Sequence, residues 1–327
     1  MITRRSTLRG LAAGAAAVAA APLLAQVQDD RATVTIVVGA ASSMDSTARL
    51  VAEVLRDGLN RPVIVLSRLG AGARLAVGEV KRAAPDGRTL LFSSSGPLVI
   101  YPNIYTKLDY DTFKDLAPVA SVSSFDLGVA VSPSTGITDI HQFVEWVKAK
   151  GPSGIEYGDS PGAGSSSHFC GISLAMATGL KLNAVHYKDS GPGMIDLASG
   201  RIPMLITGTQ PLVEMHRAGK VRLIAVSGAV RSPMRPDIPT LKESGIDVVI
   251  QNSTGLYAPA KTPPAVVERL HAVLMPLLER PDIRDRLVAL GMVPMSMNGS
   301  QLAASLAEDT ARYAKLVKAS GYVPEPL

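Results

Sequence analysis

Residues 160–169, SPGAGSSSHF, hold four serines, two glycines and one histidine. These residue types suit two chemistries: a serine nucleophile activated by a histidine, or a backbone-rich loop that binds an anion. A serine hydrolase on an α/β sheet carries its nucleophile in a G-x-S-x-G turn between a strand and a helix. The run Gly162-Ala163-Gly164-Ser165-Ser166 does not match that pattern, and His168 stands where a helix should begin. We favour binding, and keep as an alternative a hydrolase that uses Ser165 or Ser166 with His168.

Three further loops share this composition of small, glycine-rich or hydroxyl-bearing residues. Each follows an expected strand and precedes an expected helix, where backbone N–H groups are free to bind an anion. Capping and turn formation would explain any one of them. Four loops in equivalent positions favour a binding site instead. The loops are residues 39–44 (GAASSM), 67–73 (SRLGAGA), 93–97 (SSSGP) and 159–167 (DSPGAGSSS).

Phosphate, disulfide and metal chemistry find little support. Gly70-Ala71-Gly72 lacks the third glycine of a dinucleotide loop, and no P-loop lysine follows either glycine-rich loop. Cys170 is the one cysteine, so no internal disulfide forms, and we expect it to be a small buried residue. We predict no metal and no cofactor, because the remaining histidines lack metal-ligand spacing. These are His141, His186, His216 and His271.

Composition and charge indicate a globular chain without a nucleic-acid partner. The 327 residues are 46% hydrophobic and 19% charged. The formal charge of +5 includes Arg4, Arg5 and Arg9 of an N-terminal leader, and without these three it falls to +2. No run of lysine and arginine interleaved with aromatic residues is present, which argues against nucleic-acid binding.

Residues 1–25 are predicted to be an export signal, with a basic front, an apolar Ala/Gly-rich middle and a small-residue end. The Arg4-Arg5 pair resembles a twin-arginine signal, although Thr7 stands where that motif usually has a large apolar residue, so ordinary secretion stays open. We expect cleavage after Ala25. No cysteine follows the apolar run, so we expect no lipid anchor and a mature protein free in the periplasm.

The elements that position the loops are expected to alternate between strands and helices. Strand-like runs occur at 34–38, 62–66, 89–93, 127–132, 155–158, 182–187, 203–207 and 221–227. Helices are expected after residue 44, with Asp45 as the cap, at 73–84, at 139–150, after the 159–167 loop, and from Pro264 to the end. Such alternation is typical of mostly parallel sheets covered by helices.

The pattern restarts after Asp126, which predicts two α/β lobes with a ligand cleft between them. We expect lobe one to comprise residues 26–125 and 229–327, including the C-terminal helices. Lobe two is expected at 126–228.

Several stretches of the chain resemble the Bug-type receptors, the extracytoplasmic substrate-binding proteins of tripartite tricarboxylate transporters. They run from Thr33 almost to the C-terminus and include RPVIVLSRLGAGA, RAAPDGRTLLFS, GAGSSSH, VHYKDSGPG and RPDIPTLKESG. The resemblance implies a two-lobed periplasmic-binding-protein-like fold of type II, with a hinge and an interlobe cleft. It also implies a small organic acid ligand, gripped by backbone N–H groups and hydroxyls rather than by an arginine, and a membrane permease as partner. We expect a monomer and no enzymatic activity.

The resemblance carries a set of ligand-binding residues onto this sequence. From the first lobe they are Ala41, Ser42, Ser43, Asp45, Gly70, Ala71, Gly72 and Ser94; from the second they are Ser160, Gly162, Ala163, Gly164, Ser165, Ser166, Tyr187 and Asp189. The first loop lacks the aromatic residue and most of the glycines usual in the family, whereas the 162–168 loop agrees well. We therefore expect the far end of the ligand to be bulkier, less charged or aromatic, or the site to be weakened. A sensory receptor that signals to a membrane kinase would share the same lobes and stays open as an alternative.

Overall fold

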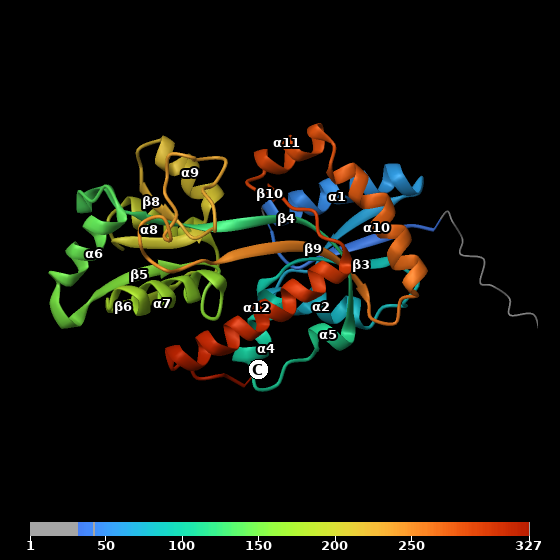
Figure 1. Ribbon diagram of the computed structural model, residues 1–327, viewed down its shortest axis with the longest axis horizontal. Helices are drawn as coiled ribbons and strands as arrows, with labels where there is room; N and C mark the ends of the chain where they lie inside the picture. Colours follow the sequence, from blue (N-terminus) through green and yellow to red (C-terminus); the bar gives the residue numbers. More distant parts are fainter. Residues whose placement is uncertain (1–31, 42, 327) are drawn as a thin grey trace, which may run out of the picture. The chain divides into compact units, whose positions relative to one another are not determined.

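The computed structural model describes residues 32–41 and 43–326 (Figure 1). The predicted export signal, its cleavage site and Ser42 lie outside the described residues. No helix in the described ranges is both long enough and apolar enough to cross a membrane.

The first lobe is built on three parallel strands in the order β2 (Val63–Ser67), β1 (Val34–Val38) and β3 (Thr89–Ser94). Val34, Ile36, Val37 and Val38 of β1 are all fully buried, as expected for a central strand covered on both faces. The helices of this part are α1 (Ser43–Leu59), the short 3₁₀ turn η1 (Ala71–Ala73), α2 (Arg74–Lys81), α3 (Gly96–Val99), α4 (Tyr101–Ile104) and α5 (Thr112–Asp115).

The second lobe repeats this plan with β6 (Leu182–His186), β5 (Ile155–Asp159) and β7 (Met204–Gly208), again parallel. Its helices are η2 (Pro133–Thr135), α6 (Ile140–Lys148), η3 (Gly151–Ser153), α7 (Ser166–Thr178), α8 (Ser190–Ala198) and α9 (Thr209–Arg217). The strand β8 (Arg222–Val226) pairs antiparallel with the second half of the long strand β4 (Leu116–Val131).

Two strands join the halves into one path of strands, β2-β1-β3-β9-β4-β7-β5-β6. β4 (Leu116–Val131) pairs with β9 (Gln251–Pro259) up to Asp126, and from Leu127 onward it pairs with β7 and β8. Figure 1 shows β4 and β9 running between the two groups of elements. The pairs that β4 and β9 make are antiparallel, so the parallel pairing predicted from the sequence holds for β2-β1-β3 and for β7-β5-β6 but not for the strands next to β4 and β9.

The C-terminal part is helical, as expected, with α10 (Pro264–Leu278), α11 (Pro281–Ala289), the short β10 (Val293–Pro294) and α12 (Gly299–Ser320). Asn298 caps α12 in a reciprocal arrangement with Gln301, which satisfies two N–H groups at the helix start. α12 packs along β4, α3 and α4 and also reaches α7, where the rings of Tyr313 and Phe169 lie 5.7 Å apart. The C-terminal helices therefore contact both lobes.

Several predicted element boundaries differ from the observed ones. α1 begins at Ser43, so Asp45 lies inside its first turn and is not its cap. The helix expected at 73–84 begins at Arg74, because Ala73 has a left-handed φ of 72°, and it ends at Lys81. Asp139 was placed within a helix and instead caps α6, accepting a hydrogen bond from the Gln142 N–H.

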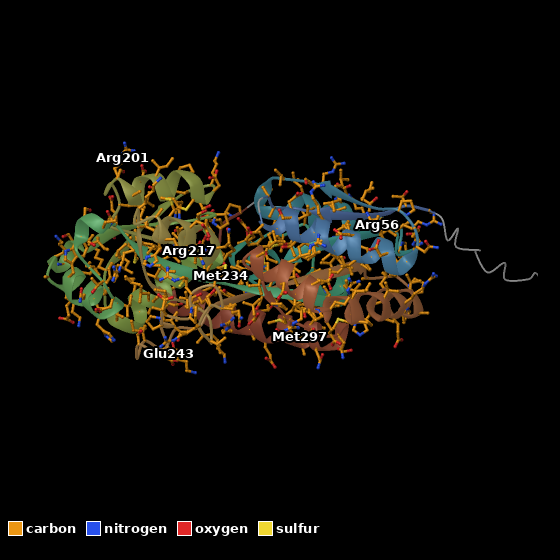
Figure 2. The ribbon with its side chains drawn as sticks, turned by 90° about the horizontal axis from the view of Figure 1, so that it is seen from above. Arg56, Arg201, Arg217, Met234, Glu243 and Met297 are labelled. Atoms are coloured by element: carbon orange, nitrogen blue, oxygen red, sulfur yellow. The ribbon has the colours of Figure 1, made fainter. Side chains whose placement is uncertain are left out.

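The surface arginines are mostly paired locally. Figure 2 labels Arg56 in the first lobe and Arg201 and Arg217 in the second. Each lies 3.1 Å or less from an acidic neighbour: Asp57, Asp196 and Glu214, respectively.

Candidate functional site

The four loops singled out in the sequence all follow the carboxyl ends of parallel strands and precede helices. Three follow β1, β2 and β3, which are neighbours in one sheet, and the fourth follows β5, between β6 and β7. In open α/β sheets this edge is where ligands bind.

The first two loops touch each other. The Ser67 hydroxyl donates to the Asp45 carboxylate at 2.6 Å, and Arg49 Nε donates to the same carboxylate at 2.7 Å. The Ser67 hydrogen bond and the Arg49 charge lower the pKa of Asp45, so it is ionised and already paired. Ala41 is exposed and Ser43 begins α1. Asp45 therefore ties the loops together.

The 70–73 turn has an unusual backbone. Gly70, Ala71, Gly72 and Ala73 have φ of 124°, 47°, 59° and 72°, a run of left-handed residues that exposes successive backbone groups. A Cβ on Gly72 would lie 2.1 Å from the Tyr101 hydroxyl oxygen, so only glycine fits against α4. This turn is held against α4.

The loop after β3 lies near polar groups that the sequence did not single out. A Cβ added to Gly96 would lie 4.0 Å from Asn252 Oδ1, on β9, and 4.0 Å from Ser94 Oγ. Asn252 Nδ2 and Ser253 Oγ are buried and have no hydrogen-bond partner among the described residues. Buried polar atoms are normally satisfied, so these two are candidate ligand contacts. The sequence gives no local signal for Asn252 and Ser253, because the strand that holds them, β9, is not predicted from the sequence.

The loop after β5 is the most highly organised of the four. Gly162 and Gly164 have φ of 100° and 72°. The Ser165 hydroxyl caps α7 by accepting from the His168 N–H at 3.2 Å. Ser165 Oγ also lies 2.7 Å from Ser167 Oγ, which donates to the Ser160 carbonyl at 2.7 Å. These contacts fix the loop around the start of the helix.

The first turn of α7 presents free backbone donors. Among the described residues, the N–H groups of Ser166 and Ser167 have no protein acceptor, whereas those of Ser165, His168 and Phe169 do. The positive end of the helix dipole lies at the same place. An anion fits this arrangement.

Three side chains that the sequence analysis did not bring together, Asp159, His168 and His186, meet at this loop. His186 Nδ1 lies 2.8 Å from Asp159 Oδ2, and the His168 and His186 rings are 4.7 Å apart. Burial raises the pKa of Asp159 to about 6, opposed by His186 and the Gly162 N–H. Burial and His186 lower the pKa of His168 to about 4. In the register of β5 and β6, Asp159 lies directly opposite His186, a neighbour relation that chain spacing cannot reveal.

Tyr187 and Asp189, predicted ligand residues, have local roles. The Tyr187 hydroxyl donates to Asp196 Oδ2 at 2.9 Å, and burial, with help from Asp196, raises its pKa to about 12. Asp189 caps α8 by accepting from the Gly191 N–H. The backbone of Tyr187 lies close to Gly162, so the two loops are adjacent.

The hydrolase alternative finds no support in the geometry. Ser165 Oγ bonds to Ser167, and the His168 Nδ1 atom accepts from the Gly164 N–H at 3.1 Å. Within residues 32–41 and 43–326, no serine hydroxyl is hydrogen-bonded to a histidine ring.

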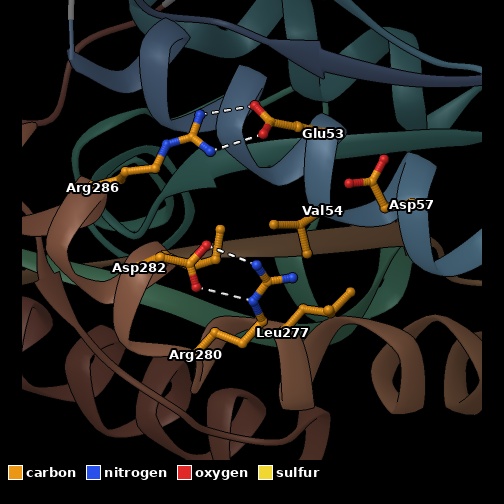
Figure 3. Close-up of a pocket in the computed structure, with 8 residues that line it drawn as sticks. Glu53, Val54, Asp57, Leu277, Arg280, Asp282 and Arg286 are labelled. Carbon is orange, nitrogen blue, oxygen red and sulfur yellow. Dashed lines mark hydrogen bonds and ion pairs between the residues drawn. The ribbon is translucent and has the colours of Figure 1, made fainter.

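A pocket between α1 and α11 lies away from these loops (Figure 3). It is lined by ion pairs: Arg286 binds Glu53 through two contacts of 2.8 Å, and Arg280 binds Asp282. Because these charged side chains are paired with one another, we interpret the pocket as part of the packing between the two helices and not as a ligand site.

Comparison with known proteins decides the family. Residues 47–322 match the model of the tripartite tricarboxylate transporter family receptor. The chain belongs to this family. The Bug-type resemblance and the two-lobed α/β fold predicted from the sequence are thereby confirmed, and the family's receptors work outside the cytoplasm.

Relatives of this receptor chain are known from sequence and structure. A UPF0065 protein of Bordetella bronchiseptica is 33% identical over 289 residues, covering 88% of this chain and 85% of that one. The periplasmic binding protein BugD has a TM-score of 0.77 at 29% identity, with 90% and 99% of the two chains covered. A Rhodopseudomonas palustris protein solved with adipate has a TM-score of 0.81 at 26% identity (90% and 98%). MatC of the same organism, solved with malate, has 0.76 at 28% (87% and 98%).

Proposed function

We propose that this protein is a periplasmic receptor that binds a small organic acid between its lobes and delivers it to the permease of a tripartite tricarboxylate transporter. The neighbours solved with adipate and with malate support a carboxylate ligand. We infer a binding protein and not an enzyme, since the candidate serines and histidines do not form a nucleophile–base pair.

The observation that carries the proposal is the start of α7. The unpaired N–H groups of Ser166 and Ser167, with Gly162 and Gly164 in left-handed conformations beside them, form a cradle for one carboxylate. Charge-assisted N–H···O⁻ bonds contribute on the order of 1.5–3 kcal/mol each. Several of them replace a counter-charge and leave the site able to release its ligand.

The first lobe is proposed to hold the other end of the ligand. Its polar candidates are Ser94, Asn252 and Ser253, neutral groups with both donors and acceptors. The first loop lacks the aromatic residue and most of the glycines usual in the family, which favours a ligand whose far end is bulkier or less charged than that of a small dicarboxylate.

The test is a thermal-shift screen of the mature protein against succinate, malate, adipate, longer diacids and aromatic monoacids. A ligand at 100 times its dissociation constant adds about 2.7 kcal/mol of stability. We expect at least one larger acid to stabilise the protein, and a strain lacking the receptor to lose uptake of that acid. No stabilisation by any organic acid would contradict the proposal; tight binding of succinate or malate alone would refute only the argument about the far end.

A further inference from the structure

Asp159, His168 and His186 form a cluster that the carboxylate cradle does not use. Each offers one oxygen or nitrogen of the kind that binds metals, and these three atoms lie within 4.8 Å of one another. The cluster joins the end of β5, the first turn of α7 and the end of β6.

The carboxylate of Asp159 is incompletely paired. Its side chain is fully buried, and Oδ1 has no hydrogen-bond partner in the described part of the chain. No lysine or arginine of that part forms an ion pair with it; the titratable side chain that contacts it is His186, at 2.8 Å. A buried carboxylate is costly unless it is paired or coordinates a metal.

We propose that this cluster binds one divalent late-transition-metal ion, of which Zn²⁺ is the representative. One carboxylate and two imidazoles are a common set of zinc ligands and leave a fourth position for water or another oxygen. Imidazole nitrogens favour zinc, nickel or copper over magnesium and calcium, which prefer oxygen.

Loading requires small local changes. Zinc bonds of about 2.0–2.2 Å place the ligand atoms of a tetrahedral ion roughly 3.3–3.6 Å apart. Ligand atoms that are now up to 4.8 Å apart must therefore approach, whereas Asp159 Oδ2 and His186 Nδ1, now 2.8 Å apart, must separate. The His186 side chain is 39% exposed and can move inward, and it also gives the ion a path from solvent. His168 must release its hydrogen bond from the Gly164 N–H, because the neutral ring has one lone pair and Nδ1 now uses it.

The surroundings favour a defined site over a loose one. The rings of Phe169 and Tyr322 pack against His168, at 5.8 Å and 5.9 Å between centroids, and the Tyr157 hydroxyl donates to the His168 carbonyl. Apolar walls and fixed ligand orientation raise metal affinity.

The test uses tag-free mature protein that has been treated with a chelator and titrated with Zn²⁺ alone by calorimetry, with Mg²⁺ as a comparison. We expect one Zn²⁺ per chain and no comparable binding of Mg²⁺. Co²⁺ in place of Zn²⁺ should give visible absorption typical of a four- or five-coordinate site with nitrogen ligands.

Two variants test the proposed ligands, and a third is the control. His186→Gln changes a partly exposed side chain and should fold normally, and Asp159→Asn is nearly isosteric; each should weaken Zn²⁺ binding by more than about 100-fold. His141→Gln, on an exposed histidine of α6, is the matched control and should bind as the parent does. Retention of the Zn²⁺ site in folded His186→Gln, its loss in His141→Gln, or equal binding of Mg²⁺ would overturn the proposal.

Discussion

At the scale of single residues, Asp126 marks the point where β4 changes its pairing partners. Up to Asp126 the strand pairs with β9, and beyond it the strand pairs with β7 and β8. Its side chain is buried, and desolvation raises its pKa from 3.8 to about 6. Because the pKa is higher in the folded state than in the unfolded chain, the folded state binds more protons between pH 4 and 6. Its free energy of unfolding therefore falls as the pH rises through that window.

Asp126→Asn removes this charge while keeping the shape of the side chain. A shift of two pKa units corresponds to about 3 kcal/mol, which is the upper limit of the expected stabilisation at pH 7. The measurement is the urea midpoint at pH 4 and at pH 7, with Glu145→Gln, an exposed acid on α6, as the control. A variant whose stability falls between pH 4 and 7 as steeply as that of the parent protein would show that Asp126 is not responsible.

At the scale of elements, α7 packs on β5 through a glycine. A Cβ on Gly171 would lie 2.2 Å from the Tyr157 hydroxyl oxygen, and the Tyr157 ring is itself almost completely buried. This close approach sets the height of α7 above the sheet and hence the position of the loop that begins it.

Gly171→Ala should destabilise the protein although alanine is the better helix former. Overpacking costs about 1–3 kcal/mol, which exceeds the gain of about 1 kcal/mol in helix propensity. Gly208→Ala is the matched control, because nothing lies within 4 Å of its added Cβ. Chemical denaturation of both variants is the check, and equal stability of the two would mean that α7 shifts without cost.

Elements with a regular apolar pattern could be predicted from the sequence, and crossing strands could not. β1, with VTIVV, was predicted at its observed bounds. The first half of β4 and all of β9 were missed, because Ser121, Ser123 and Ser124 and the run from Gln251 to Thr254 look like loop residues. They are buried as strands because each pairs with the other, and the Ser123 and Thr254 hydroxyls bond at 2.7 Å. Pairing between residues 131 positions apart leaves no local signal.

Part of the candidate site could likewise be predicted from the sequence, and part could not. Loop positions at strand ends followed from strand–helix alternation, and so the four loops could be named. Asp159, His186, Asn252 and Ser253 became candidates only when the register of the sheet brought them to the loops.

At the scale of the whole molecule, the described contacts suggest a revised lobe boundary. The Ile250 N–H donates to the Ser227 carbonyl at 2.8 Å, and Thr240 bridges to Val226. We propose that lobe two extends from Asp126 to about residue 250, beyond the Gly228 limit expected from the sequence, and that the hinge consists of β4 and β9 near Asp126.

Binding of a ligand identified by the screen should close the lobes about this hinge. Small-angle scattering at saturation should give a smaller radius of gyration than the free protein, because hinge closure brings the lobes together. Protein in which Gly164 is replaced by leucine serves as the non-binding control, since its φ is 72° and a Cβ would lie 2.4 Å from Ile104 Cδ1. An unchanged radius at saturation would indicate a rigid, preformed site.

The position of β9 between β3 and β4 also determines the order in which the two lobes can fold during synthesis. When only the first 250 residues have been synthesised, β9 is still absent. β3 and the first half of β4 then each have an unpaired edge. Lobe two, a continuous stretch, can fold on its own during that time, whereas the first lobe cannot be completed before residues 251–327 are made. A nascent chain that stalls or ends before Pro259 therefore exposes unpaired strand edges. These edges are prone to aggregation and require a chaperone until β9 has been synthesised.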